Sequence, residues 1–578
     1  MRIIMEREKD KNLEYLKHSA AHLLAQAVKE LFPQTKLTIG PTTEKGFFYD
    51  FLPERNFTQE DIPLIEEKMG EIIKRDLPIT HENISKEEAK VLYKDNPFKL
   101  ELIEGIPDNM VGISRQGDFF DLCKGGHVSS TGKLKHVKLT NISGAYWRAD
   151  KKNQPLQRIY GVVFFTEKDL KDYEKKIEEA KLYDHRRLGK QLDLFSFHEA
   201  GVGFPFFHPK GKTIINLLTD FLRKRLEKEG YKEIATPTIL SEQLWKQSGH
   251  YDHYKENMYF THVDEKGYAI KPMNCPGTIL VYKSRPHSFR ELPLKFSEFG
   301  KVHRHELSGV LHGLLRVRAF TQDDAHVFCT PDQMEEEIIK LIKLVYSVLK
   351  RFEFKKIKVE LSTKPEDAMG SDELWSKAIT ALEKALQKEK IAYTIEKGAG
   401  AFYGPKIDFI IEDSMGREWQ CSTIQVDFFL PQNFDLTYVA SGGEKKRPVM
   451  IHRAIYGSFE RFFAILLEHY KGKLPFWLSP IQARILTITD EQKPYAKQIL
   501  KLLKDHNIRV ELDSSGEQIS AQIKAAQLEK IPWMIVIGKK EVENNTITLR
   551  HRNGKQEFGL TVEQLLEKAK EAMKISDV

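Results

Sequence analysis

The segment covering residues 296–328 is rich in arginine, histidine and carboxylate side chains and offers the densest chemistry in this 578-residue chain. If its second half is a strand, alternation puts these polar residues on one face: Arg316, Arg318, Gln322, Asp324 and His326. Small apolar residues then occupy the other face. Arginine forks match phosphate oxygens, and an imidazole beside a carboxylate suits a metal or an amine. A solvated charged strand is the alternative interpretation of the pattern alone.

The whole segment Phe296–Phe328 resembles motif 2 of the class II aminoacyl-tRNA synthetases, and in detail that of the threonyl-tRNA synthetases. Residues 220–240, DFLRKRLEKEGYKEIATPTIL, are similar to motif 1, with Pro237 at its proline position. His452–Phe462, HRAIYGSFERF, is similar to motif 3. The resemblance extends from about residue 12 to the C-terminus. It implies an enzyme that activates threonine with ATP, transfers it to the 3′ end of threonine tRNA, and hydrolyses mischarged seryl-tRNA.

Local composition and the positions of prolines predict how the chain is divided into segments. A charged run after Phe165, which Thr166 could cap, indicates a solvated helix, and the prolines of LPFWLSP mark a boundary near residue 474. The strands and helices that alternate after it predict a small α/β domain with a mainly parallel sheet. With the resemblance, the fold class is α/β and α+β multidomain, in four segments: an α+β editing domain (1–165), a connector helix (166–188), a class II catalytic domain built on an antiparallel sheet (189–473) and an α/β anticodon-binding domain (474–578).

The overall composition limits the class of protein. Four cysteines in 578 residues argue against a disulfide scaffold and for a reducing compartment. The N-terminus lacks the apolar core of a signal peptide, and no apolar run is long enough to span a bilayer. A net charge of +7 permits a nucleic-acid partner without requiring one. We therefore expect a cytoplasmic multidomain protein with no membrane association.

One cysteine and two histidines, Cys275, His326 and His452, are candidate metal ligands. Their wide separation makes the pattern weak by itself, because scattered Cys and His are more often packing residues. The resemblance implies that they bind one Zn²⁺ per subunit, with a fourth coordination position open to substrate. An apolar pocket separates threonine from isosteric valine poorly, whereas a metal that meets the amino and hydroxyl groups does so well. Serine has the same two groups, so a second site is needed.

The resemblance also implies roles in adenylation and transfer. Arg304 and Arg461 are expected to hold phosphates of ATP, together with Glu306 and Arg316, while Mg²⁺ bridges phosphate oxygens. His250 matches a histidine that assists transfer. The positions that match the threonine pocket are Gln322, Asp324, Tyr403, Lys406, Gln420 and Gln425. Leu315 and Ala319 replace the family's usual Met and Gly, and we expect little effect from either change.

A second cluster is expected near the N-terminus. HSAAH puts His18 and His22 on one helical face, and DLCKGGH adds Cys123 and His127 beside Asp121. With twenty histidines HxxxH alone is not distinctive, but CxxxH is rarer because there are only four cysteines. From the residues alone this set predicts a second zinc site. The resemblance instead implies a metal-free editing site that positions water and the terminal ribose, and metal binding stays the alternative. A proline is common in the family where Gly126 stands, which could loosen the loop.

The last hundred residues resemble an anticodon-binding domain. Glu541 and Arg550 match positions that contact anticodon bases. Gly516 replaces a position that is often Asn, which removes an amide donor from that contact. Motif 1 implies a homodimer. Many relatives carry a further small N-terminal domain that is not visible here, and its loss would affect grip on tRNA rather than adenylation.

Two other functions fit parts of the pattern. One is a degenerate class II paralogue that activates or senses an amino acid without charging tRNA. The other is a non-catalytic RNA-binding protein, which the positive charge and the C-terminal domain would allow. The retained arginines of motifs 2 and 3 and the Cys/His set argue against both. Threonine-dependent exchange of pyrophosphate into ATP would separate the three.

Overall fold

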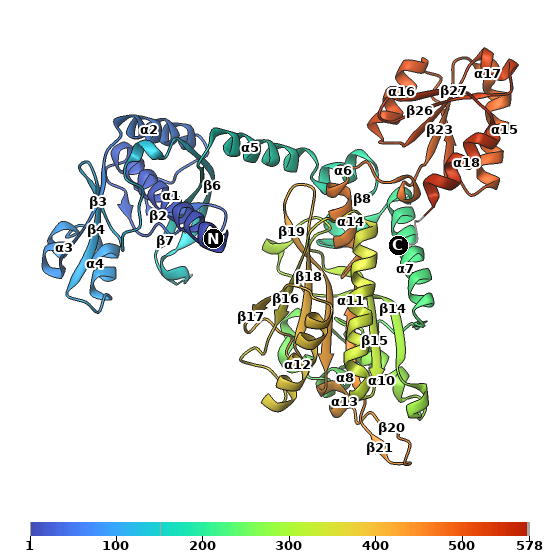
Figure 1. Cartoon of the computed structure of the whole chain (residues 1–578), viewed down its shortest axis with the longest axis horizontal. Helices are drawn as coiled ribbons and strands as arrows, with labels where there is room; N and C mark the ends of the chain where they lie inside the picture. Colours follow the sequence, from blue (N-terminus) through green and yellow to red (C-terminus); the bar gives the residue numbers. More distant parts are fainter. Residues whose placement is uncertain (1, 151, 575–578) are drawn as a thin grey trace. The chain divides into compact units, whose positions relative to one another are not determined.

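The computed structural model describes residues 2–150 and 152–574 of the chain, which forms two compact units, Met1–Glu178 and Glu179–Val578 (Figure 1). The division of the chain into four segments remains a proposal. Among the described residues, no helix is both long and apolar enough to cross a membrane.

The first unit is built on a long N-terminal helix that packs against an antiparallel sheet. Helix α1 buries an apolar stripe that includes Leu16, Leu24 and Val28 against strands β2 and β7. A second, three-stranded sheet in the order β3-β4-β5 carries the short helices α3 and α4. The elements are α1 (Arg2–Leu31), β1 (Lys36–Leu37), β2 (Phe47–Leu52), α2 (Asp61–Arg75), β3 (Ile79–Ser85), α3 (Lys86–Leu92), α4 (Pro97–Glu104), β4 (Met110–Gln116), β5 (Phe119–Leu122), β6 (His136–Tyr146) and β7 (Pro155–Phe164).

Helix α5 (Glu167–Leu182) follows the first unit's last strand. The backbone N–H of Asp169 donates to Thr166 Oγ1 at 3.2 Å, so Thr166 caps the helix as the sequence predicts. The side chains of α5 are exposed or half-buried, which fits a solvated helix.

The second unit is organised by an eight-stranded, mostly antiparallel sheet in the order β10-β14-β15-β22-β19-β18-β16-β17. Helices α7, α11, α12 and α14 bury apolar faces against it in one continuous core. The strands are β10 (Lys232–Glu233), β14 (Leu294–His303), β15 (Ala319–Cys329), β16 (Ile357–Ser362), β17 (Thr394–Glu396), β18 (Lys406–Glu412), β19 (Glu418–Asp427) and β22 (Val449–Ala454). The helices are α6 (His185–Gln191), α7 (Pro209–Lys228), α11 (Met334–Arg351), α12 (Asp372–Lys388) and α14 (Phe459–His469).

Smaller elements flank this sheet. Helix α10 begins at Cys275, and a three-stranded sheet in the order β11-β13-β12 carries α8 and α9. These elements are β8 (Phe195–Ser196), β9 (Phe206–Phe207), β11 (Ile239–Ser241), α8 (Glu242–Gln247), α9 (His250–Tyr254), β12 (Tyr259–Val263), β13 (Lys266–Ile270), α10 (Cys275–Lys283), α13 (Phe429–Asn433), β20 (Tyr438–Val439) and β21 (Lys445–Lys446).

The strand predicted for motif 2 is partly wrong. Strand β15 begins only at Ala319, so Arg316 and Arg318 lie in the preceding loop. Gln322, Asp324 and His326 do lie on the strand, spaced by two residues as expected. The loop contains a 3₁₀ turn at Ser308–Val310 and a tight turn in which His312 pairs with Arg316. Val317 is buried between Arg316 and Arg318, which is why the sequence pattern continued beyond the strand.

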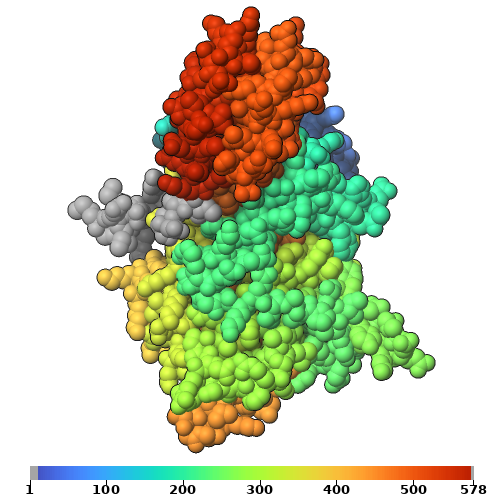
Figure 2. All heavy atoms as spheres, turned by 90° about the vertical axis from the view of Figure 1, so that its right-hand side faces the viewer, coloured from blue at the N-terminus to red at the C-terminus, as the bar shows by residue number. Residues whose placement is uncertain are grey.

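The C-terminal part, coloured orange to red, forms its own sheet in the order β24-β23-β25-β26-β27 (Figure 1). In the space-filling view it is one continuous mass that adjoins the green residues of the second unit (Figure 2), where Lys210 Nζ pairs with Glu529 Oε2 at 2.8 Å. The elements are β23 (Ala483–Thr487), α15 (Lys493–Asp505), β24 (Val510–Leu512), α16 (Ile519–Leu528), β25 (Trp533–Ile537), α17 (Lys539–Glu543), β26 (Ile547–His551), β27 (Gln556–Leu560) and α18 (Val562–Met573).

This sheet is less parallel than the sequence predicts. Strands β24, β23 and β25 are parallel, but β26 and β27 are antiparallel to their neighbours. A parallel connection needs a crossover of about a dozen residues, and only residues 538–546 separate β25 from β26. The chain therefore turns back after the short helix α17.

Candidate functional site

Three buried donors from different elements meet at the middle of the core sheet. Cys275 begins helix α10, His326 lies on β15 and His452 lies on β22. Strands β15 and β22 pair so that His326 stands opposite His452, with ring centroids 4.8 Å apart. One donor atom from each of the three residues lies within 4.8 Å of the other two. Antiparallel pairing thus brings together residues that are far apart in the sequence.

This donor set fits a zinc ion. His326 is 1% exposed, yet its Nε2 has no hydrogen-bond partner among the residues that the structure describes. Burial lowers the pKa of His326 well below its usual value, so the imidazole is neutral and free to donate a lone pair. Burial raises the pKa of the Cys275 thiol, and a bound cation would compensate for the charge of the thiolate. His452 Nε2 donates to Asp427 Oδ2 at 2.9 Å, which orients its ring.

Polar side chains gather next to these donors. Asn274 Nδ2 donates to Asp324 Oδ2 at 3.2 Å, and Asp324 Oδ1 lies 3.8 Å from His326 Nε2. The Tyr403 hydroxyl donates to Gln425 Oε1 at 2.6 Å. The Tyr403 ring lies 5.0 Å from that of His452. Three of the six residues expected in the threonine pocket (Asp324, Tyr403 and Gln425) therefore surround the Cys/His set.

Two further expected pocket residues lie along the neighbouring strands. Lys406 Nζ pairs with Asp408 Oδ2 at 2.8 Å, and Gln420 Nε2 donates to Asp408 Oδ1 at 2.6 Å. Lys406 stands opposite Gln425 in the sheet, which keeps it near the pocket. Gln420 also lines the cavity described below.

His250 is buried beside the same donors, at the start of helix α9. Its Nε2 lies 3.7 Å from Cys275 Sγ, and its Nδ1 lies 2.8 Å from Ser248 Oγ. Burial lowers the pKa of His250 to about 3, helped by His452 and Arg304. The ring is therefore neutral at physiological pH.

A cavity of about 680 Å³ adjoins the loop that precedes β15. Arg304 lies over the rings of Tyr254 and Phe320, with its guanidinium carbon 5.5 and 5.1 Å from their centroids. Arg316 Nε donates to Glu306 Oε2 at 2.9 Å. The cavity is lined by all four residues expected to bind ATP and by Gln322 of the expected threonine pocket: Arg304, Glu306, Arg316, Gln322 and Arg461. Arg461 Nε is buried without a partner in the described part of the chain.

Asp323 organises the wall of this cavity, and the sequence analysis missed it. Its carboxylate accepts the backbone N–H groups of residues 455–457 at 2.6, 2.9 and 3.0 Å. Arg453 Nη1 donates to the same carboxylate at 3.2 Å. Burial raises the pKa of Asp323 to about 6. The Asp-Asp doublet was the available signal, because alternation sends Asp324 to one face of β15 and Asp323 to the other.

The first unit contains a separate cluster. His18 and His22 lie one turn apart on α1, and Cys123 and His127 follow β5. Cys123 Sγ lies 3.0 Å from His127 Nε2 and 3.5 Å from His18 Nε2. Burial lowers the pKa of His22 well below its usual value and that of His127 to about 2, while it raises that of the Cys123 thiol. Neutral imidazoles next to an uncharged thiol suit both water activation and metal binding.

Asp121 is held by two residues that the sequence analysis missed. Lys99 Nζ pairs with Asp121 Oδ1 at 2.5 Å, and the Tyr49 hydroxyl donates to Asp121 Oδ2 at 2.6 Å. Asp121 Oδ2 is also 3.8 Å from His22 Nδ1. Burial and the carboxylate raise the pKa of Tyr49 well above its usual value. Lys99 lies in the helix PFKLELIE, which also carries Glu101 and Glu104, so nothing in the local sequence signals that this lysine is buried.

The loop of this cluster has an unusual backbone. Gly126 has φ of 86°, a conformation that proline cannot adopt. A Cβ at this position would also lie 2.8 Å from the Tyr15 ring. The glycine therefore fixes a tight, left-handed loop here rather than only loosening it.

The expected anticodon residues belong to the C-terminal sheet, apart from the core site. Glu541 accepts from Gly538 N at 2.9 Å and from Thr548 Oγ1 at 2.8 Å, so its carboxylate caps α17. Arg550 lies two residues beyond Thr548 on β26, on the same face, and its Nε is buried. Gly516 has φ of 70° in the loop before α16.

Three family models match successive parts of the chain. Residues 111–160 match the threonyl and alanyl tRNA synthetase second additional domain. Residues 259–470 match the tRNA synthetase class II core domain (G, H, P, S and T), and residues 482–572 match an anticodon binding domain. The class II fold expected from the sequence is confirmed.

Curated relatives and solved structures extend this similarity. The chain is 54% identical over 540 residues to a threonine–tRNA ligase of Clostridium tetani, with 93% of this chain and 84% of the relative covered. It is 54% identical to the corresponding ligase of Acetivibrio thermocellus, with 96% and 88% covered. Among solved structures, the RNA binding domain of threonyl-tRNA synthetase from Cryptosporidium parvum aligns with TM-score 0.66 and 44% identity, over 67% of this chain and 98% of that one. A putative threonyl-tRNA synthetase from Aeropyrum pernix aligns with TM-score 0.60 and 34% identity, over 68% and 96%.

Proposed function

This chain belongs to the threonine–tRNA ligase family of class II synthetases, and on that premise we propose which of its residues carry out each step. The observation that supports the assignment best is the Cys275, His326 and His452 set, with donor atoms within 4.8 Å, beside the arginine-lined cavity of about 680 Å³. Donor atoms suited to a metal ion, next to a cavity lined by arginines suited to phosphate, would bind an amino acid and ATP side by side.

The cavity is proposed to bind ATP together with Mg²⁺. In adenylation the threonine carboxylate attacks the α-phosphorus and pyrophosphate leaves, so the protein must align the groups and neutralise charge. Arg304 lines the cavity, is held over two aromatic rings and is proposed to bind the α-phosphate. Arg461, with an unpartnered buried Nε in the described part of the chain, is proposed to take the γ-phosphate. Glu306 orients Arg316 through their ion pair.

The Cys/His set is proposed to hold one Zn²⁺ and to be the centre of the threonine pocket. Bound there, Zn²⁺ supplies a Lewis acid for the amino and hydroxyl groups of threonine. Asp324 is oriented by Asn274 and can accept a hydrogen bond from the ammonium group. Tyr403 and Gln425 line the same space through their mutual hydrogen bond, with Gln322, Lys406 and Gln420 on the adjoining strands. Valine, which lacks the hydroxyl group, would lose these contacts.

His250 is proposed to assist transfer of the acyl group to tRNA. Its neutral ring is proposed to accept a hydrogen bond from the ribose hydroxyl that attacks the adenylate. Its position beside Cys275 puts it next to the amino-acid pocket.

The cluster of the first unit is proposed to hydrolyse mischarged seryl-tRNA. His22 and His127, both neutral, can hold and activate a water molecule, with His18 and Cys123 completing the pocket. Asp121, fixed by Lys99 and Tyr49, can orient His22 or the ribose. The donor atoms also fit a metal ion, and metal analysis of a variant that lacks Cys275 separates the two alternatives.

Recognition of tRNA is proposed to use Glu541 and Arg550 of the C-terminal sheet. Since Glu541 already caps α17, its contact with a base would use the remaining lone pairs. Residues 220–240, which comprise the end of α7 and strand β10, are proposed to form the interface of a homodimer, and the cytoplasm is the proposed location.

The decisive experiment is ATP–pyrophosphate exchange with threonine, serine and valine, before and after zinc is removed by a chelator. Strong exchange with threonine, weaker exchange with serine, none with valine, and loss after chelation would support the assignment. A folded, zinc-loaded protein without threonine-dependent exchange would contradict it.

A further inference from the structure

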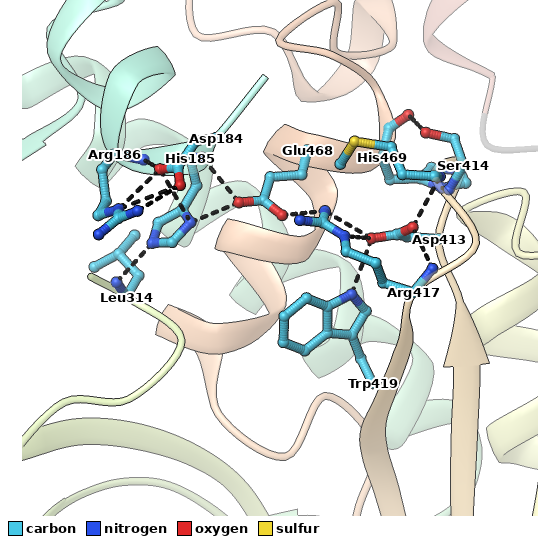
Figure 3. A network of polar contacts seen from close by, with 11 residues as sticks. Asp184, His185, Arg186, Leu314, Asp413, Ser414, Arg417, Trp419, Glu468 and His469 are labelled. Atoms are coloured by element: carbon cyan, nitrogen blue, oxygen red, sulfur yellow. Dashed lines mark hydrogen bonds and ion pairs between the residues drawn. The ribbon is translucent and has the colours of Figure 1, made fainter. Parts of the chain in front are cut away.

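A third cluster of ionisable groups consists of Asp184, His185 and Glu468 (Figure 3) and shares no residue with the two Cys/His sets. Each group is already engaged. Asp184 caps α6 by accepting from Arg186 N at 2.8 Å, and the second oxygen of Glu468 binds Arg417. His185 uses both ring nitrogens, as described next. The polar atoms of the cluster are thus already used within the protein, and another role must explain why His185 and Glu468 are buried, at 0% and 1% exposed.

The two ring nitrogens of His185 have opposite hydrogen-bonding roles: one donates and the other accepts. Glu468 Oε1 accepts from His185 Nδ1 at 2.7 Å and from its backbone N at 2.9 Å. The backbone N–H of Leu314 donates to His185 Nε2 at 3.1 Å. These partners require the neutral tautomer with the proton on Nδ1. His185 is therefore a two-ended connector between helix α14 and the loop before β15.

At its contact with Leu314, His185 holds a turn of the loop before β15. Gly313, with φ of 48°, approaches so closely that a Cβ would lie 2.1 Å from His185 Nε2. His312 and Arg316 close the turn through backbone bonds in both directions, at 3.2 and 3.3 Å. His312, Leu315 and Arg316 all line the cavity of about 680 Å³. The position of His185 thus sets the position of one cavity wall.

Through its contact with Glu468, His185 is connected to two other walls of the cavity. Glu468 ends the helix whose first turn carries Arg461. Its partner Arg417 also pairs with Asp413 and lies over Trp419, with the guanidinium carbon 5.4 Å from the ring centroid. Trp419 lines the cavity too, and its Nε1 donates to Asp413 Oδ2 at 2.9 Å (Figure 3). A single chain of buried polar contacts therefore joins the loop, helix α14 and the start of β19 around the nucleotide cavity.

From this geometry we propose that His185 is a positioning residue for adenylation, which holds the 312–316 turn against α14 so that the ATP cavity is preorganised. The proposal rests on the proposed assignment of the cavity to ATP. His185 does not reach the cavity itself; it acts through Leu314 and Glu468. Loss of the connection frees the turn, and ATP must then order it on binding, whereas the threonine pocket around Cys275 is unaffected.

The test compares His185→Phe, which keeps a ring but loses both hydrogen bonds, with His185→Gln, whose amide can still accept from Leu314 and donate to Glu468. In ATP–pyrophosphate exchange we expect His185→Phe to raise KM for ATP about tenfold and to change KM for threonine less than about twofold. His185→Gln should recover at least half of the effect. His506→Gln, an exposed histidine at the end of α15, is the matched control.

A second variant acts from the other side of the contact. Gly313→Ala pushes a methyl group into the buried His185 ring and should raise KM for ATP by a similar factor. Because both changes break one contact, the double variant His185→Phe/Gly313→Ala should be little worse than either single variant. Additive effects, or equal rises in KM for ATP and threonine, would overturn the role. Wild-type protein without threonine-dependent exchange would instead refute the proposed function itself.

Discussion

The buried pair of Lys99 and Asp121 in the first unit makes a quantitative prediction. Both side chains are 2% exposed, and their charged atoms are 2.5 Å apart. Lys99→Met keeps the aliphatic bulk but leaves the Asp121 carboxylate without its cation. Removal of one partner of a buried pair costs about 3–5 kcal/mol, because an uncompensated charge remains. We therefore expect the first unit to lose about 3 kcal/mol of unfolding free energy.

Hydrogen–deuterium exchange of the full-length protein measures this loss locally. A destabilisation of about 3 kcal/mol accelerates exchange roughly 150-fold where global opening of the unit controls it. Peptides from β2 and β4 should show this change, while peptides from β15 in the second unit should not. Lys90→Met is the matched control, since Lys90 forms an exposed pair with Glu87 in the same unit. Its loss should lower the unfolding free energy by about 0.5 kcal/mol or less.

The double variant Lys99→Met/Asp121→Asn tests the cause. An amide at position 121 can still accept from the Tyr49 hydroxyl but carries no charge, so more than half of the lost stability should return. If Lys99→Met exchanges no faster than Lys90→Met, or if the double variant is as unstable as the sum of the single variants, the argument from buried charge is refuted.

Three further predictions concern the second unit and the editing cluster. Burial raises the pKa of Glu460 from 4.5 to about 7, so the folded state binds a proton that the unfolded state releases between these values, and stability should fall by about 3 kcal/mol as pH rises from 4.5 to 7. Glu460→Gln should remove this dependence in denaturant titrations; an unchanged slope would contradict it. Cys275→Ser should lose zinc, measured by atomic emission, together with threonine activation, and a metal-free but fully active variant would refute the zinc assignment. Cys123→Ala should leave charging intact while seryl-tRNA accumulates, and serine clearance at the wild-type rate would show that the editing site lies elsewhere.

The sequence predicted which side chains gather at the candidate sites. The motif residues Arg304, Glu306, Arg316 and Arg461 line one cavity, and both Cys/His sets converge to within 4.8 Å. These groups were recognisable because the sequence around them resembles the motifs of a known family, whereas the spacing of the residues alone was weak evidence. The class II core was recognisable for a similar reason, since the three motifs occur in order.

What the sequence could not predict depends on tertiary packing. Lys99 reads as an exposed lysine, because nothing local shows that Asp121 will be buried beside it. The connection from His185 to Glu468 spans 283 residues, which no periodicity can reveal. The motif 2 strand was placed too early because Val317 is buried between Arg316 and Arg318, so the residues just before Ala319 alternate as a strand does. The C-terminal sheet was predicted to be mainly parallel, whereas β26 and β27 are antiparallel to their neighbours, because strand direction depends on the length of a connection more than on strand composition.

The paired carboxylates of β15 have a consequence for how this enzyme family can change. Asp324 faces the Cys/His set and the proposed amino-acid pocket, while Asp323 accepts hydrogen bonds from the backbone of residues 455–457 on the other face. Insertion of one residue between the start of β15 and this doublet would exchange the two faces and destroy both functions at once. The loop before Ala319 has no alternation to preserve between Glu306, which pairs with Arg316, and the 312–316 turn held by His185. Natural variation in length should therefore accumulate in residues 307–311, while strand β15 keeps a constant number of residues.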